Sequence, residues 1–248
     1  MVDIHSHILP GFDDGARTLE EAIEMLRLAA ASGTTDIVAT SHSNVEFTFD
    51  PQRAEAAIAE LQNSAAGLPR IHFGCELHFT PENVESILGA PRAWSIAHQG
   101  YVLIEFDDFL IPKTAGEILR HLSGVVRPIL AHPERNPVLQ RQVDRLESFV
   151  QQGCLVQVTA QSLSGRFGQA AKAAAEELLE RNLVHCIASD AHNTGSRSPV
   201  LHEARCWVER RHSAELAVEL FETNPRAVLA GTPIQRKPAR KRSWFAFR

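Results

Sequence analysis

Histidines and carboxylates recur along the chain at short intervals that point to metal chemistry. His5 and His7 lie two residues apart behind the first hydrophobic residues, and Asp13 and Asp14 follow within seven residues. Imidazole and carboxylate groups together suit Mn, Fe or Zn better than Mg or Ca. A single His-x-His pattern says little, because histidines also cap helices and fill cores. Its meaning depends on which other groups the fold brings beside this pair.

The elements that would position these groups are short apolar runs, each followed by a helical pattern. Runs of four or five apolar residues are typical of strands buried in a parallel sheet. Seven or eight strand–helix units usually close into a barrel, so the sequence predicts an α/β barrel, with a doubly wound open sheet as the alternative. The expected strands are residues 2–5, 36–40, 71–75, 101–105, 128–131, 155–159 and 184–188.

Helical segments are expected between and after these strands, without an interdomain linker. Thr18 and Glu21 stand at capping-box spacing, and Pro51 suits the first position of a helix. A single domain is therefore expected over residues 1–234. The expected helices are residues 18–31, 51–65, 81–88, 114–123, 137–152, 169–181, 199–211, 213–222 and 225–230.

Six of the seven expected strands end in His, Asp or Glu, at the end of a barrel where active sites lie. Glu76, Glu105 and Asp190 would repel one another there unless cations lay between them. The candidates outnumber the ligands of one ion, which predicts two or three ions and at least one bridging carboxylate. Clustered ions activate water for attack on phosphorus, so the expected reaction is phosphoester hydrolysis. The candidate metal ligands are His5, His7, Asp14, His42, Glu76, Glu105, His132, Asp190 and His192.

The motifs at these strand ends resemble the PHP superfamily, named for polymerase and histidinol phosphatase. More narrowly, the chain is similar to the bacterial PHP-type tyrosine phosphatases of capsule and exopolysaccharide clusters. The similarity runs from residue 1 to about residue 230, with the motifs in the same order and at the same spacing. The matching stretches are DIHSHILPGFDDGA, TSH, CELHFTPE, LIEF, AHPER and SDAH.

This resemblance implies a distorted (β/α)7 TIM-like barrel that holds three divalent ions. Manganese is the expected ion, with Fe, Zn or Mg as alternatives. The implied substrate is the phosphotyrosine tail of a membrane-associated tyrosine autokinase that regulates polysaccharide synthesis, hydrolysed through metal-activated hydroxide. By position, His5, His7, Glu76 and Asp190 would hold the first ion; Glu76, Glu105 and His132 the second; and Asp14, His42 and His192 the third.

Two arginines also match the family, and both are expected to bind the phosphate of the substrate. Arg135 follows the histidine of the fifth strand, and Arg197 lies five residues beyond His192. A guanidinium group binds phosphate oxygens in a fork and stabilises the charge that develops on them.

The choice of one metal ligand has an alternative, because Asp13 could serve in place of Asp14.

Other functions stay open at this point. Another PHP phosphoesterase, such as a histidinol-phosphate phosphatase, is the nearest rival, although many such enzymes have His where Glu105 stands. A metal-binding regulatory module without catalysis is the second rival, disfavoured by the complete ligand set. The cysteine-based tyrosine phosphatase mechanism is excluded, because no cysteine is followed by an arginine six positions later.

Charge and composition limit the binding partners and the cell compartment that we expect. A net charge of −5 argues against a general nucleic-acid partner. Residues 235–248 are the exception, since they carry six Lys or Arg and no acid; we expect a disordered tail, with weak contact to an anionic membrane surface as its possible function. Four cysteines without a CxxC pair indicate a reducing compartment. With no signal peptide or membrane span recognisable, a cytoplasmic location is expected.

Overall fold

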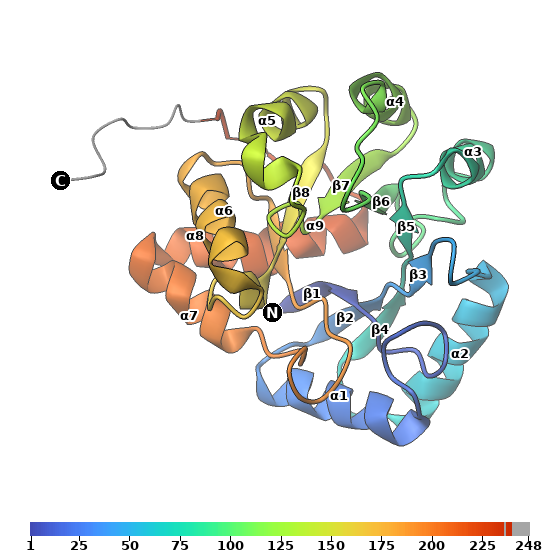
Figure 1. The fold of residues 1–248 in the computed structure, drawn as a ribbon. Helices are drawn as coiled ribbons and strands as arrows, with labels where there is room; N and C mark the ends of the chain where they lie inside the picture. Colours follow the sequence, from blue (N-terminus) through green and yellow to red (C-terminus); the bar gives the residue numbers. More distant parts are fainter. Residues whose placement is uncertain (236, 240–248) are drawn as a thin grey trace.

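The chain folds into two parallel sheets that form a ring, with helices packed around the outside (Figure 1). The computed structural model describes residues 1–235 and 237–239, so most of the basic tail predicted at 235–248 lies outside the described residues. The strands of the described part are β1 (Val2–Ser6), β2 (Asp36–Ala39), β3 (His42–Ser43), β4 (Arg70–Phe73), β5 (Glu76–His78), β6 (Tyr101–Glu105), β7 (Arg127–Ala131), β8 (Leu155–Thr159) and β9 (Cys186–Ala188).

Helices follow the strands along most of the chain, as the alternating pattern predicts. The α-helices are α1 (Leu19–Ala31), α2 (Pro51–Ser64), α3 (Pro81–Gly89), α4 (Ala115–Leu122), α5 (Val143–Gln151), α6 (Gly168–Glu180), α7 (His202–Arg211), α8 (Ala214–Val218) and α9 (Asn224–Ala230). Two 3₁₀ turns, η1 (Leu139–Arg141) and η2 (Ala160–Ser162), and one π turn, η3 (Glu219–Thr223), complete the described part.

The ring contains seven strand segments, two of which are interrupted. The sheets have the orders β1-β2-β4 and β3-β5-β6-β7-β8-β9. The expected strand 36–40 continues past Thr40 and Ser41 as β3, and the expected strand 71–75 continues past Cys75 as β5. A bridge between Ser6 and Ala191 joins β1 to the chain that leaves β9. The expected α/β barrel with seven strand–helix units is therefore confirmed.

The ring is distorted between β4 and β6, because another segment lies between them at the lower end of the barrel, which is the end at which the strands begin. Ala97 donates its backbone N–H to the carbonyl of Phe73 at 2.7 Å, and Ile96 forms an antiparallel bridge with Tyr101. The segment formed by β4 and β5 pairs directly with β6 only toward the upper end of the barrel, where the strands end and β5 lies beside β6. The upper half of the ring is thus the more regular part, and it is the half that carries the candidate ligands.

Local hydrogen bonds explain where the helices begin and end. Thr18 caps α1 by accepting the N–H of Glu21 at 3.2 Å, as its capping-box spacing predicts. The single helix expected over 137–152 is wrong, since η1 and α5 are separated at Gln142, whose φ is −131°. The Asn136 side chain accepts the N–H groups of the two residues at 138 and 139, which starts a separate turn.

The last helices form one continuous rod rather than the two segments expected at 213–222 and 225–230. The π turn η3 joins α8 to α9 without a break. Pro225 has no N–H to donate, and a wider turn before it accommodates the missing hydrogen bond. Of the helices in residues 1–235, none is long and apolar enough to cross a membrane.

The barrel interior is apolar at its lower end and polar at its upper end. The lower end is filled by side chains from the first halves of the strands, including Val2 and Ile4 of β1 and Leu103 of β6.

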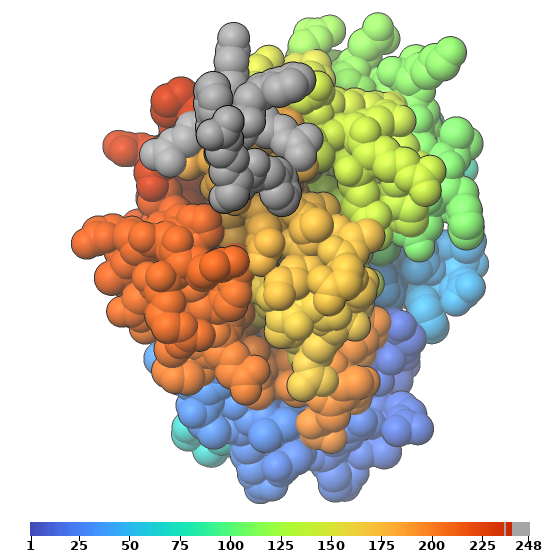
Figure 2. Space-filling view, turned by 60° about the vertical axis from the view of Figure 1, so that its left-hand side comes forward, coloured from blue at the N-terminus to red at the C-terminus, as the bar shows by residue number. Residues whose placement is uncertain are grey.

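The four cysteines form no disulfide, and all but Cys206 are buried. Figure 2 shows the outer face where α6 (yellow) lies beside the C-terminal helices α7 and α8 (orange).

Candidate metal centre

A bulge in β1 turns two histidines into the upper end of the barrel. Asp3 pairs with Ile37 and Ser6 pairs with Ala39, so β1 has one residue more than β2 over the same stretch. Alternation would place His5 on the opposite face from the inward-facing residues 2 and 4, and the extra residue reverses that alternation. His5 therefore points into the same interior as the apolar floor beneath it.

Unusual backbone conformations aim two further side chains. His132 follows the last residue of β7 with a φ of 30°, and Asp190 follows β9 with a φ of 51°. Residues other than glycine rarely take positive φ, and those that do are concentrated at functional sites. Both residues are buried and face the histidines of β1.

The structure brings the nine candidate ligands together in one cluster above the apolar floor. Six of them are buried, His42 and Glu105 are partly buried, and Asp14 is exposed. Eight of them fall into three overlapping groups in which one ligand atom from each residue lies within 4.8 Å of the others. The ninth, His132, contacts two members of the third group. The groups are His5, His7, Glu76 and Asp190; His7, Asp14, His42 and His192; and His42, Glu76 and Glu105.

Glu76 lies at the middle of the cluster and faces different imidazoles with its two oxygens. Its Oε2 atom is 3.2 Å from His5 Nε2, 3.3 Å from His7 Nε2 and 3.1 Å from His42 Nδ1. Its Oε1 atom is 2.9 Å from His132 Nε2. A carboxylate whose two oxygens face separate donor sets has the geometry of a bridging ligand between two ions.

The neighbours Asp13 and Asp14 face different atoms. Asp14 Oδ1 is 3.3 Å from His192 Nε2 and 3.5 Å from His42 Nε2, inside the cluster. Asp13 Oδ2 instead accepts a hydrogen bond from His7 Nδ1 at 2.8 Å and from the backbone N–H of His42 at 2.9 Å. The geometry therefore favours Asp14 as the ligand and gives Asp13 the task of orienting a ligand.

Gly15 allows the Asp13–Asp14 loop to lie against β1. A Cβ atom at this position would stand 2.1 Å from the carbonyl oxygen of His7, which no side chain can tolerate. The N–H of Ala16 donates to the same carbonyl at 3.0 Å. The DDGA stretch therefore needs a glycine at this position, because any side chain would clash with the backbone of β1.

Gln157 is an orienting residue that the pattern at the strand ends does not predict. It lies on β8, which among the seven strand segments is the one without a candidate ligand at its end, and its Oε1 atom is 2.9 Å from His5 Nδ1. The same oxygen accepts the backbone N–H of His132 at 3.3 Å. An available signal was the polar residue in the middle of the buried run LVQVT.

Arg135 and Arg197 converge on one oxygen at the edge of the cluster. Both guanidinium groups contact Asp190 Oδ2, and the Arg197 Nη2 atom lies 2.7 Å from it. The ring of Phe167 lies 4.3 Å from the guanidinium carbon of Arg135 and 6.0 Å from that of Arg197. Phe167, a second residue that the pattern at the strand ends does not predict, therefore supports both arginines.

The charges of the cluster compete with one another. Burial disfavours ionisation of Glu76, but the imidazoles of His5 and His42 outweigh it and hold the pKa of Glu76 well below its usual range. Burial, together with the negative charges of Glu76 and Asp190, raises the pKa of Glu105 to about 9. Three carboxylates in one cavity can all ionise only when further positive charge lies among them.

The donor set fits divalent cations. Three buried atoms that face the interior of the cluster have no hydrogen-bond partner among the described residues: Glu76 Oε2, Asp190 Oδ1 and His42 Nδ1. Burial and the neighbouring Arg135 lower the pKa of His132 to about 4, so its imidazole is neutral at pH 7, the form that binds metals. Buried carboxylate oxygens without a hydrogen-bond partner, close to imidazole nitrogens, are what a mixed histidine and carboxylate metal site requires.

Comparison with known proteins finds relatives that align along nearly the whole chain. Residues 1–230 match the family model "Capsular polysaccharide synthesis, CpsB/CapC". Tyrosine-protein phosphatase YwqE of Bacillus subtilis is 34% identical over 260 residues and aligns along all of both chains. Tyrosine-protein phosphatase CpsB of Streptococcus pneumoniae is 31% identical, over 92% of this chain and 98% of its own length.

Solved structures show the same fold. A structure from a study of YwqE of B. subtilis and CpsB of S. pneumoniae, described there as unique metal-dependent tyrosine phosphatases, matches with a TM-score of 0.91. It is 33% identical and covers 98% of this chain and 100% of its own. Dihydropyrimidinase of Brevibacillus agri, 13% identical with a TM-score of 0.56, covers 96% of this chain and 73% of its own and shares the fold alone.

The resemblance noted in the motifs is thereby confirmed over nearly the whole chain. The family model spans residues 1–230, and the aligned relatives exceed 30% identity along almost all of their own lengths. The chain belongs to the CpsB/CapC family of capsular polysaccharide synthesis.

Proposed function

We propose that this protein is a metal-dependent phosphatase that hydrolyses phosphotyrosine in a polypeptide. The observation that carries the proposal is the cluster around Glu76, with two arginines at its edge. The relatives named as tyrosine-protein phosphatases support the choice of substrate.

Three divalent ions, with manganese first and Fe, Zn or Mg as alternatives, are the cofactors we propose. His5, His7, Glu76 and Asp190 would hold the first, which agrees with one of the groups. Bound there, divalent ions would supply positive charge that activates water and neutralises phosphate oxygens. The remaining proposed ligands are Glu105 and His132 beside Glu76 for the second ion, and Asp14, His42 and His192 for the third.

The arginines would bind the phosphate group of the substrate. Arg135 and Arg197 now share Asp190 Oδ2, and a phosphate at the mouth of the cluster would offer them further oxygens. Guanidinium groups form bidentate hydrogen bonds with phosphate and stabilise the charge of its transition state. Phe167 would keep both groups in place as they turn toward the substrate.

The physiological substrate that we propose is the phosphotyrosine tail of a membrane-associated tyrosine autokinase that regulates capsular or exopolysaccharide synthesis. The family description supports a place in capsular polysaccharide synthesis. We further propose that the enzyme acts in the cytoplasm and binds no nucleic acid, in keeping with a net charge of −5.

A substrate comparison tests this function. The enzyme loaded with Mn²⁺ should turn over a phosphotyrosine peptide with a far higher kcat/KM than histidinol phosphate, the substrate of the nearest rival. His132→Ala and Asp190→Ala should abolish hydrolysis of p-nitrophenyl phosphate while circular dichroism shows an intact fold. Preference for histidinol phosphate, or wild-type rates in either variant, would refute the proposal.

A further inference from the structure

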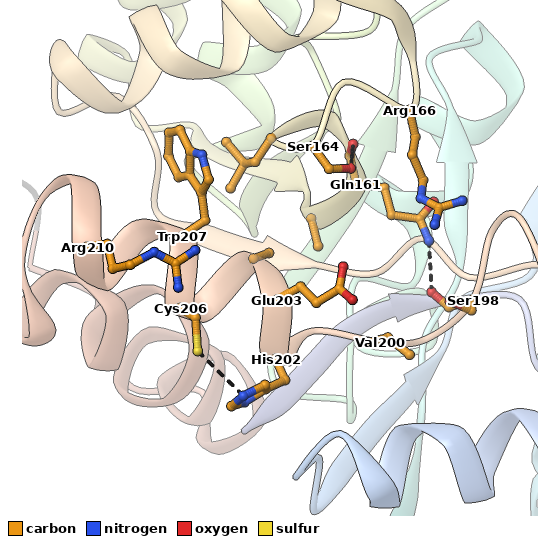
Figure 3. Close-up of a pocket in the computed structure, with 13 residues that line it drawn as sticks. Gln161, Ser164, Arg166, Ser198, Val200, His202, Glu203, Cys206, Trp207 and Arg210 are labelled. Atoms are coloured by element: carbon orange, nitrogen blue, oxygen red, sulfur yellow. Dashed lines mark hydrogen bonds between the residues drawn. The ribbon is translucent and has the colours of Figure 1, made fainter.

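A cavity of about 530 Å³ lies between residues 160–166 and α7 (Figure 3). Two of its lining residues adjoin the groups assigned to the phosphate: Arg166 precedes Phe167, and Ser198 follows Arg197. Gln161 Nε2 donates to the carbonyl of Ser198 at 3.3 Å and ties the two loops together. The cavity therefore begins one residue away from the arginine pair.

The lining combines an apolar wall with cations. Leu163 and Trp207 contribute apolar surface, and Arg166 and Arg210 are exposed side chains of opposite walls. Neither of these two guanidinium groups forms an ion pair with a residue of the described chain, whereas Arg205 of the same helix α7 lies 3.4 Å from Glu222. Two cations without an ion-pair partner among the described residues thus face a space large enough for a side chain.

Two more side chains define the chemistry of the cavity. Gln161 is 9% exposed, and its Oε1 atom is buried without a hydrogen-bond partner among the described residues. This acceptor suits a backbone N–H. Glu203 places one carboxylate inside the cavity (Figure 3), whereas two guanidinium groups line it. The balance of charge stays positive, and Glu203 opposes an acidic ligand.

We propose that this cavity binds an acidic residue that flanks the phosphotyrosine of the polypeptide substrate. This inference rests on the proposed function, because it extends the same site along the peptide. An extended peptide advances about 3.3 Å per residue, so a side chain a few positions from the phosphotyrosine reaches the cavity. Arg166 and Arg210 would bind the carboxylate, and Gln161 Oε1 would accept a backbone N–H of the peptide.

Peptide kinetics with the full-length, Mn²⁺-loaded enzyme test the inference. Three phosphotyrosine peptides of equal length carry Glu before the phosphotyrosine, Glu after it, or Gln on both sides. The wild type should process one acidic peptide with about five-fold higher kcat/KM than the Gln peptide at low salt. The double variant Arg166→Gln, Arg210→Gln should lose this preference, and Glu203→Gln should enlarge it.

The controls separate this inference from the proposed function. Arg70→Gln with Arg92→Gln changes two exposed arginines, one at the start of β4 and one between α3 and β6, and should keep the preference. All variants should hydrolyse p-nitrophenyl phosphate at the wild-type rate, because it lacks flanking residues. Equal kcat/KM for acidic and Gln peptides in the wild type, or a preference that survives in Arg166→Gln, Arg210→Gln, would overturn the inference. Failure of the wild type on every phosphotyrosine substrate would instead overturn the proposed function, and the inference with it.

Discussion

At the scale of residues, neighbouring side chains of the same type have different tasks. Asp13 and Asp14 are equivalent in sequence, but the first binds His7 Nδ1 and the second faces His192 Nε2. The orientation of a metal-binding imidazole depends on the hydrogen bond made by its other nitrogen. Asp13 should therefore contribute to metal affinity by orienting His7 and not by binding the ion itself.

Asp13→Ala should weaken Mn²⁺ binding by about 10-fold to 100-fold, because His7 loses the partner that fixes its ring. Isothermal titration of the metal-free protein with Mn²⁺ measures this change. Asp108→Ala removes an exposed carboxylate from the loop after β6 and should leave the affinity unaltered. Equal affinity in Asp13→Ala and the wild type would contradict the orienting role.

Phe167→Ala should weaken inhibition by inorganic phosphate about five-fold, because the arginine pair loses the ring against which it packs. Phe167→Tyr retains the ring and should restore the inhibition constant. A role in folding alone would lower stability in Phe167→Ala without changing phosphate affinity. The measurement is the Ki of phosphate against p-nitrophenyl phosphate, alongside thermal unfolding.

The nine candidate ligands could be found from the sequence because each stands at or just beyond the end of a strand segment or in the loop that follows. The structure brings them together, and their role as ligands stays a prediction. Gln157 and Phe167 could not be found in this way, since one lies within a strand and the other acts through its contacts with two distant arginines. Their tasks depend on distances that only the folded chain defines.

At the scale of elements, periodicity predicts strands and helices but not their irregularities. The bulge in β1 adds one residue that no apolar pattern reveals, yet it decides which face His5 occupies. The separate turn before α5 begins where the Asn136 side chain accepts two backbone N–H groups, and the continuous rod through Pro225 depends on a π turn. Tertiary and side-chain contacts override propensity at each of these positions.

Glu134 joins two elements through a buried carboxylate and makes stability depend on pH. Its Oε1 atom accepts the N–H of Thr159 at 3.0 Å and the hydroxyl of Ser162 at 2.6 Å, which links the loop after β7 to β8 and η2. Burial raises the pKa of Glu134 to about 7, above an ordinary value of 4.5. The folded protein thus holds a proton that the unfolded chain releases, and stability falls as pH rises from 4.5 through 7.

Glu134→Gln keeps the accepting oxygen and cannot ionise, so it should remove this loss. In metal-free protein, the free energy of unfolding of the variant should gain on that of the wild type by on the order of 3 kcal/mol between pH 4.5 and pH 8. Urea unfolding at both pH values measures the difference. A constant difference between the two proteins across this range would show that Glu134 does not carry the effect.

At the scale of the whole molecule, closure of the ring concentrates charge at one end. Side chains from strand segments far apart in sequence meet above the apolar floor because parallel strands share one carboxyl edge. This outcome follows from the alternating pattern of the sequence. The distortion between β4 and β6 does not, since it arises from the segment around Ala97.

The basic segment 235–248 should attract the protein weakly to anionic membranes. Each basic residue near such a surface contributes about 1 kcal/mol. Deletion of these residues should abolish co-sedimentation with phosphatidylserine vesicles and leave turnover of p-nitrophenyl phosphate unchanged. Vesicles of phosphatidylcholine alone are the control, and equal binding by the full-length and shortened proteins would exclude a membrane role for the tail.

Above all, we expect divalent cations to lie among imidazoles and carboxylates contributed by six strand segments. Crystals of the Mn²⁺-loaded protein, recorded on both sides of the manganese absorption edge, test it most directly. We predict anomalous peaks within the cluster, one of them surrounded by His5, His7, Glu76 and Asp190. Fully active protein whose crystals show no anomalous peak in this cluster would contradict this expectation.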